Sequence, residues 1–148
     1  MWTVDLHSWR PVHPGRLFDR IEDLGAGPRR GRGRLRLANR PDEITLWDGA
    51  GGQLAIGSTP LRAGGPAWLW TPDACAATAP STGAPSSRLV ITGVDERRDH
   101  VVRAFDQILL TDAQIARGRR WWRGRADGFG PWLGPASGEQ GQHQARPA

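Results

Sequence analysis

The sequence contains no lysine, since all 20 of its basic residues are arginine. A P-loop needs a lysine that reaches the β- and γ-phosphates of a nucleotide, and Schiff-base catalysis needs an amine. A guanidinium group replaces neither of them. The sequence therefore excludes a P-loop nucleotide site and catalysis by a lysine.

Cysteine occurs only once, at Cys75. A single cysteine excludes an internal disulfide bond and the paired-cysteine motifs of zinc sites. Long apolar runs are also lacking, because none approaches the roughly 20 residues that cross a bilayer. The first ten residues include Asp5 and His7 among their few apolar side chains. We therefore expect a cytoplasmic protein without a signal peptide, a membrane span or a membrane partner.

The length of 148 residues suits one domain with a single core. Its last segment, residues 134–148, is rich in glycine, proline, glutamine and alanine and contains no valine, leucine or isoleucine. Such a segment cannot offset the entropy lost on ordering. We predict a folded domain over residues 1–133 and a disordered tail over residues 134–148.

Hydrophobic periodicity predicts a strand and then a helix near the N-terminus. Residues 2–9 alternate between the two faces of a strand with one buried side. His13 suits the cap of a helix with Pro14 at its first position, and Gly25 suits a left-handed residue that ends it. The expected core stripe of this helix consists of Leu17, Ile21 and Leu24, broadened toward the sheet by Phe18.

The remaining elements complete an α+β pattern. Residues 33–38, 43–48 and 53–57 predict a meander of strands, and residues 67–71, with Trp68 and Trp70, and 87–93 predict two more. Residues 75–87 are expected to be a flexible loop, residues 96–110 an amphipathic helix, and Thr111 to Gln114 a capping box. The pattern predicts a mixed, mostly antiparallel sheet of about 4–6 strands with two main helices packed on one face.

Three separated motifs carry a resemblance to a known family. They are His13-Pro14-Gly15-Arg16-Leu17, Arg34-Leu35-Arg36-Leu37-Ala38-Asn39-Arg40-Pro41 and Leu109-Leu110-Thr111-Asp112-Ala113. In this order they resemble the HPxRL helix start, the RGxxxLAxRP strand and the LLTDAE junction in the C-terminal domain of CobW-type proteins. The resemblance extends from about Arg10 to Trp132. In that family a P-loop GTPase module comes first, so this chain is expected to contain only the second module.

The resemblance implies a function without naming a reaction. Full-length relatives couple GTP hydrolysis to the delivery of zinc or cobalt, and this domain is thought to help recognise the client. We therefore expect a non-catalytic client-recognition module in metal homeostasis, with no cofactor of its own. Its partner would be a CobW-type GTPase module or a metalloprotein client.

Four arginines form the first candidate binding site. Arg30, Arg32, Arg34 and Arg36 are two residues apart, so an extended backbone would place all four guanidinium groups on one face. Such a strip suits an acidic protein domain or a phosphate backbone. It also suits a solvated surface without a partner. An alternative function therefore stays open, that of an RNA- or ribosome-associated factor in zinc-limited actinobacterial cells.

A second candidate site combines arginine with tryptophan. Arg119 and Arg120 precede Trp121 and Trp122, an order that suits a cation–π patch for a protein partner or for stacked RNA bases. Core packing is the competing interpretation for four of the tryptophans, Trp47, Trp68, Trp70 and Trp122.

Metal and catalytic sites have little support in the sequence. His7 and His13 would be weak metal ligands if the first strand ran beside the helix start, but no HxH or HExxH spacing occurs. A capping or surface role is the alternative for both histidines. The serines lie in no nucleophile-elbow motif and the carboxylates are scattered. We predict no catalytic residue and no cofactor-binding residue.

Overall fold

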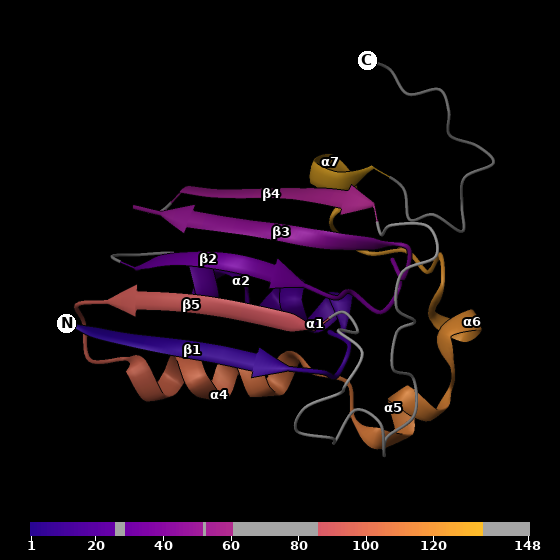
Figure 1. Cartoon of the computed structure of the whole chain (residues 1–148), viewed down its shortest axis with the longest axis horizontal. Coiled ribbons are helices and arrows are strands. Elements are labelled where there is room, and N and C mark those ends of the chain that lie inside the picture. The colour runs from indigo at the N-terminus through magenta and orange to yellow at the C-terminus, as the bar shows by residue number, and fades with distance from the viewer. Residues whose placement is uncertain (26–28, 52, 61–85, 135–148) are drawn as a thin grey trace.

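The structure, a computed structural model, describes residues 1–25, 29–51, 53–60 and 86–134. At its centre is a five-stranded sheet with the order β1-β5-β2-β3-β4 (Figure 1). All of its described strand pairs are antiparallel, and β2, β3 and β4 form the predicted meander. The strands are β1 (Trp2–Ser8), β2 (Arg30–Leu35), β3 (Glu43–Ala50), β4 (Gln53–Pro60) and β5 (Ser87–Gly93). The predicted α+β class is confirmed.

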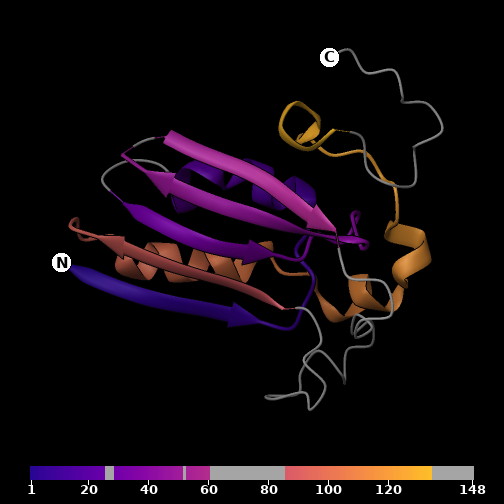
Figure 2. The ribbon, with the colours of Figure 1, turned by 45° about the horizontal axis from the view of Figure 1, so that its top comes forward.

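Three helices lie on one side of this sheet. Figure 2 shows α1 (Pro14–Asp19), α2 (Ile21–Gly25) and α4 (Arg98–Ile108) behind the strands. The predicted first helix is divided, because the residue between α1 and α2, Arg20, is not helical. The later helices, α5 (Asp112–Ala116), α6 (Arg119–Trp122) and α7 (Gly130–Leu133), follow toward one end of the sheet and the edge of β4.

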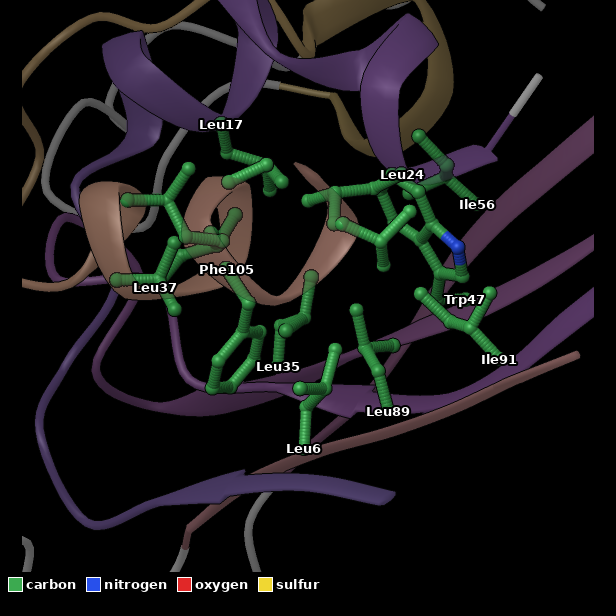
Figure 3. Close-up of a cluster of buried hydrophobic side chains, with 14 of the residues drawn as sticks. Leu6, Leu17, Leu24, Leu35, Leu37, Trp47, Ile56, Leu89, Ile91 and Phe105 are labelled. Carbon is green, nitrogen blue, oxygen red and sulfur yellow. The ribbon is translucent and has the colours of Figure 1, made fainter. Parts of the chain in front are cut away.

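The core fills the space between the sheet and these helices (Figure 3). Leu35 and Leu89 from the sheet are fully buried there, as is Leu17 from α1. Val101, Phe105 and Ile108 of α4 are buried at helical spacing, as the periodicity predicted. The sheet and the helices thus share one apolar layer, which leaves the other face of the sheet outside the core.

Two expectations for the first helix are wrong. Phe18 does not face the sheet, because it is 43% exposed and its ring packs 5.5 Å from that of Phe129. Gly25 is the last residue of α2 and is not among the described glycines with positive φ. Its small size matters instead, because a Cβ atom at this position would lie 3.0 Å from the ring of Trp47.

The predicted strand at residues 33–38 is also shifted toward the N-terminus. The backbone of Arg36 leaves the ladder, since its N–H donates to the Ser87 hydroxyl at 2.8 Å and its carbonyl accepts from the Val12 N–H at 2.8 Å. Leu37 then forms an isolated bridge with Val12. The strand ends at Leu35 because the contacts with Val12 and with the Ser87 side chain replace the sheet ladder.

Gly33 allows β2 and β5 to approach closely. A Cβ atom there would overlap the carbonyl oxygen of Arg88 in the neighbouring strand.

The capping box is confirmed, because the Thr111 hydroxyl accepts from the Gln114 N–H and the Gln114 side chain accepts from the Thr111 N–H. Together, these contacts fix the sheet and the start of the C-terminal helices.

Some expectations lie outside the described residues. They are the strand at residues 67–71, the loop at residues 75–87 apart from its last two residues, and the tail at residues 134–148 apart from Gly134. In the described part of the chain, no helix has both the length and the apolar character needed to cross a bilayer.

Candidate functional site

The face of the sheet opposite α1, α2 and α4 is called here the open face. No helix among the described residues covers it (Figures 1 and 2). The strand registers place its side chains in rows across the sheet. One row is Asp5, Val90, Arg32, Asp48 and Ala55, and the next is His7, Arg88, Arg34, Leu46 and Gly57.

The predicted arginine strip lies on the open face, but it is shorter than expected. Arg30, Arg32 and Arg34 alternate with inward residues of β2 and are exposed. The expected position of Arg36 is wrong, because its side chain is fully buried. The strip ends where the backbone turns toward Val12 and Ser87. From here on, the arginine strip means Arg30, Arg32 and Arg34.

The arginines of the open face differ in how far their charge is compensated. Arg88 donates two hydrogen bonds to Asp5, at 2.9 and 2.6 Å, and these bonds hold the pKa of Asp5 below its ordinary value. Arg32 is only 3.8 Å from Asp48, and both side chains are largely exposed. Arg34 donates to the Ser86 hydroxyl at 3.5 Å.

Arg30 and Arg34 stand apart from the other cations of the open face. Within the described ranges, no carboxylate lies within ion-pair distance of either guanidinium group. An arginine fork is well suited to bind a carboxylate through two parallel hydrogen bonds. These two residues therefore have binding capacity that the described part of the fold does not use.

A shallow hollow beside the strip is called here the open-face groove. It measures about 740 Å³ and is bordered by Arg32, Leu46, Val90, Ala55 and Gly57, among others. Leu46 is 44% exposed and Val90 is 38% exposed. Leu46 is uncovered partly because its neighbour in β4 is Gly57. A second hollow, of about 450 Å³, lies beside Asp5, His7, Arg34 and Arg88. Apolar and cationic groups thus adjoin on one surface.

The arginine and tryptophan residues near the C-terminus are only partly exposed. Trp122 is 5% exposed, and its indole N–H donates to the carbonyl of Gln114 at 2.9 Å. Its expected exposure in a partner-binding patch is wrong, and the alternative of core packing is confirmed for Trp122 and for Trp47. The structure describes neither Trp68 nor Trp70.

Trp121 already carries guanidinium groups from its own chain. The guanidinium of Arg125 lies 3.5 Å from the centroid of the Trp121 ring, and that of Arg117 lies 4.4 Å from it. Arg119 and Arg120, which precede Trp121 in α6, are exposed. An incoming base would have to displace these contacts in order to stack on Trp121.

The two candidate metal ligands lie in different environments. The Nε2 atom of His7 is 3.2 Å from the Ser86 hydroxyl, on the open face. His13 caps α1, where its Nδ1 atom accepts from the Arg16 N–H at 3.2 Å, and burial lowers the pKa of His13. No group of three potential metal ligands was found in the described ranges. The described hydrogen bonds of the two histidines are therefore made to different partners.

Three arginines in or near the predicted strip are buried, which the pattern of charges did not predict. They are Arg29, Arg36 and Arg40. Arg40 donates to Asp127 through Nε at 2.9 Å and Nη2 at 3.0 Å, and it also bonds to the carbonyl of Gly134. Burial would raise the pKa of Asp127, but hydrogen bonds from Arg40 and Asn39 outweigh it, so this pKa lies below its ordinary value. The pair holds the C-terminal segment against the residues that precede β3.

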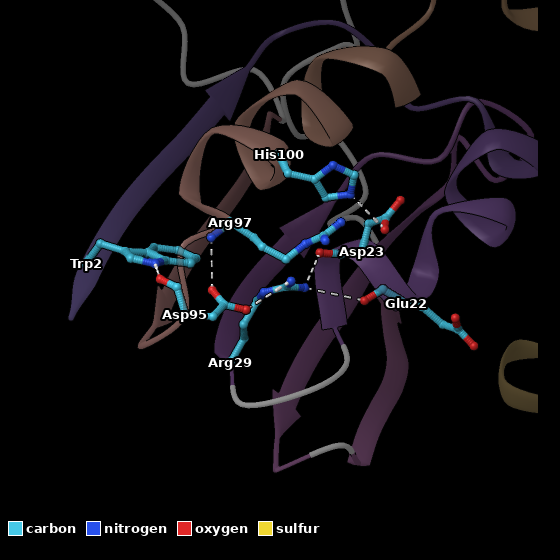
Figure 4. A network of polar contacts seen from close by, with 7 residues as sticks. All are labelled: Trp2, Glu22, Asp23, Arg29, Asp95, Arg97 and His100. Carbon is cyan, nitrogen blue, oxygen red and sulfur yellow. Dashed lines mark hydrogen bonds and ion pairs between the residues drawn. The ribbon is translucent and has the colours of Figure 1, made fainter.

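Arg29 belongs to a second structural network (Figure 4). Its guanidinium donates to the carbonyl of Asp23 at 2.6 Å and lies 3.4 Å from the Asp95 carboxylate. Asp23 is also 2.9 Å from His100, and that hydrogen bond is the main cause that lowers the pKa of Asp23. The network joins α2, the start of β2 and α4, so its charges serve the fold.

One signal in the sequence could have separated Arg36 from the strip. Glycine alternates with arginine up to Arg34, whereas leucine and alanine surround Arg36. Leu35, Leu37 and Ala38 are all fully buried. An arginine within such an apolar stretch is expected to be buried with partners, since an uncompensated buried charge is costly.

Comparisons with known proteins identify a family and relatives of this chain. The family model described as cobalamin synthesis protein cobW C-terminal domain matches residues 1–109. A protein of Mycobacterium tuberculosis named as a zinc chaperone is 31% identical over an alignment 151 positions long, which covers 87% of this chain and 34% of that protein. An uncharacterised protein of Mycobacterium bovis matches with the same identity and coverage.

A solved structure has a similar fold. The zinc-bound YjiA GTPase from E. coli aligns with a TM-score of 0.51 and 14% identity, over 73% of this chain and 29% of that one. The chain spans about a third of the length of the curated relatives that it matches.

Proposed function

The chain belongs to the family of cobalamin synthesis protein cobW C-terminal domains, and on that premise we propose that it is a non-catalytic module that binds a protein partner in metal homeostasis. The partner is a CobW-type GTPase module or a client protein that requires a metal. Zinc is the favoured metal, because a relative that is 31% identical is named as a zinc chaperone. The chain itself contributes recognition, and the partner contributes the metal chemistry.

The open face is the observation that supports this proposal most directly. A sheet face that only meets water usually carries polar side chains, as β2 does. Here Leu46 and Val90 are exposed between guanidinium groups, although similar side chains fill the core on the other side. Exposed apolar groups rimmed by polar residues are typical of a surface that binds another protein.

The alternative of an RNA-associated factor has less support from the same geometry. Arg36 and Trp122 are buried and are not available to a nucleic acid. The ring of Trp121 already contacts Arg117 and Arg125. Binding to single-stranded RNA depends on aromatic side chains that stack with bases. We therefore keep the protein partner as the proposed function.

A binding experiment with purified components tests the proposal. The chain is mixed with the part of the M. tuberculosis zinc chaperone that lies outside the matched region, and complex formation is followed by isothermal titration calorimetry. In a parallel assay the chain is mixed with a single-stranded oligouridylate. We expect a stoichiometric complex with the protein that persists in moderate salt.

Two results would contradict the proposed function. One is the absence of any complex with the protein partner. The other is binding to the oligouridylate alone, with an affinity that falls log-linearly as salt is raised, which is the signature of phosphate contacts.

A further inference from the structure

The open-face groove and the arginine strip beside it combine two kinds of uncompensated group on the open face. Leu46 and Val90 offer apolar area, and Arg34 and Arg30 offer guanidinium groups without a described carboxylate. The groove is shallow because the side chains that β4 presents on the open face here, Ala55 and Gly57, are small.

The balance of charge favours an acidic occupant. The open face carries four described guanidinium groups, those of Arg30, Arg32, Arg34 and Arg88, against the carboxylates of Asp5 and Asp48. Asp5 forms an ion pair with Arg88, so the excess positive charge lies along the arginine strip. A complementary partner would therefore bring carboxylates to β2.

The same face is poorly suited to a nucleic acid. Among its described residues it presents no exposed tryptophan or phenylalanine for base stacking. Asp48 is 56% exposed beside Arg32 and would repel a phosphate backbone. A peptide carboxylate can be placed on Arg34 without meeting Asp48, because these two residues lie in different rows.

The segments outside the described residues contain few carboxylates that could pair with the arginine strip. The segment at residues 61–85 contains one carboxylate, Asp73, and one arginine, Arg62. The segment at residues 135–148 contains one carboxylate, Glu139, and no valine, leucine or isoleucine. A second copy that used the same face would bring one arginine strip against another, since a two-fold interface pairs identical surfaces.

Building on the proposed function, we infer that the open-face groove binds an extended segment of the partner protein in which two acidic side chains flank an apolar one. One carboxylate pairs with Arg34, and the other pairs with Arg30. The apolar side chain between them covers Leu46 and Val90. Arginine forks give this segment its specificity, and the apolar contact excludes water from the ion pairs.

A peptide titration followed by NMR tests this inference directly. The probe is acetyl-Glu-Ser-Leu-Ser-Glu-amide, in which the alternating residues of an extended chain share one face. The matched probe replaces both glutamates with glutamine. We expect saturable shifts in the methyl signals of Leu46 and Val90, and at least about tenfold weaker binding of the glutamine peptide, because hydrogen bonds to charged groups are the stronger ones.

Paired variants separate the groove from the rest of the surface. Arg34→Ala removes an arginine of the open face, and Arg103→Ala removes an exposed arginine of α4 on the opposite side. We expect Arg34→Ala to weaken peptide binding about tenfold. The Arg103→Ala variant should bind within about twofold of the original chain, because surface substitutions away from a site have small effects.

Filling the groove gives a test that leaves the arginines in place. A Cβ atom at Gly57 meets nothing within 4 Å, so Gly57→Leu should fold and should abolish peptide binding. Gly130→Leu is the matched control, because a Cβ atom at Gly130 in α7 also has nothing within 4 Å. Preserved near-native spectra of both variants establish that they are folded.

Several outcomes would overturn the inference. They are equal binding of the two peptides, equal effects of Arg34→Ala and Arg103→Ala, shifts confined to residues 117–125, and groove shifts caused by an oligouridylate instead of the peptide. Methyl groups of Leu46 and Val90 already shielded in the isolated chain would also overturn it. If the peptide does not bind at the groove while the chain still binds the partner protein, the proposed function stands. If the partner protein fails to bind, the proposed function itself is refuted.

Discussion

Leu89 and Val90 are neighbours in β5, yet Leu89 is fully buried beneath the helices whereas Val90 is 38% exposed on the open face. The same contrast separates Arg40, which is 1% exposed and paired with Asp127, from Arg34, which has no described carboxylate partner. Residues on the covered side have their contacts within the fold. Residues on the open side have apolar or charged groups without described partners, which is the property expected of a binding surface.

The largest effect is expected from the two contrasted arginines. Arg40→Ala leaves the buried Asp127 carboxylate without its main partner and should lower the free energy of unfolding by about 3–5 kcal/mol. Arg34→Ala should change it by less than about 0.5 kcal/mol, as exposed substitutions usually do. Urea denaturation followed by circular dichroism measures both. Equal losses would remove the distinction between the two groups of arginines.

The next largest difference in the free energy of unfolding is expected between variants of the neighbouring apolar residues of β5. Leu89→Ala creates a cavity in the core and should lower the free energy of unfolding by roughly 2–5 kcal/mol. Val90→Ala removes a partly exposed side chain and should lower it by less than about 1 kcal/mol. Thermal unfolding of the two variants under identical conditions provides the comparison. A larger loss for Val90→Ala would indicate that the open face is covered in the isolated chain.

Two glycines on opposite sides of the sheet give a smaller contrast. Gly33→Ala forces β2 away from the backbone of β5 and should lower the free energy of unfolding by about 1–3 kcal/mol. Gly57→Ala adds a methyl group where nothing lies within 4 Å, so its stability should be unchanged or slightly higher. Chemical denaturation distinguishes these outcomes, and an unperturbed Gly33→Ala variant would refute the close strand approach.

The smallest expected effect is the loss of folding stability in acid that is due to Asp127. The folded-state pKa of Asp127 lies below the ordinary value of about 3.9. The stabilisation it contributes is therefore present above that value and is lost as the pH falls below it through the folded-state pKa. Asp127→Asn should lose part of this acid dependence while Arg34→Ala keeps it. Unfolding curves between about pH 5 and about pH 2 provide the measurement.

The sequence was sufficient to predict the elements whose side chains follow a regular period. The alternation in residues 2–9, the helical spacing of Val101, Phe105 and Ile108, and the capping box at Thr111 all depend on contacts close in sequence or on one buried face. The order of strands was not predictable in this way, because β5 reaches its place between β1 and β2 through long-range pairing.

The candidate site was predictable only in part, for a similar reason. Spacing alone placed Arg30, Arg32 and Arg34 on one face, and this is confirmed. Arg36 left the strip because Val12 and Ser87, distant in sequence, bind its backbone. The exposure of Leu46 depends on its cross-strand neighbour Gly57, which no local pattern identifies. Local periodicity thus assigns a face, whereas tertiary partners decide which side chains remain free.

The most direct test of the account is methyl cross-saturation in a complex of the chain with the partner fragment of the M. tuberculosis zinc chaperone. Saturation of the partner should reduce the methyl signals of Leu46 and Val90 and leave Val102 of α4, on the covered side, unchanged. Signal loss at Val102 with Leu46 and Val90 unaffected would contradict the claim that the open face of the sheet is the binding surface.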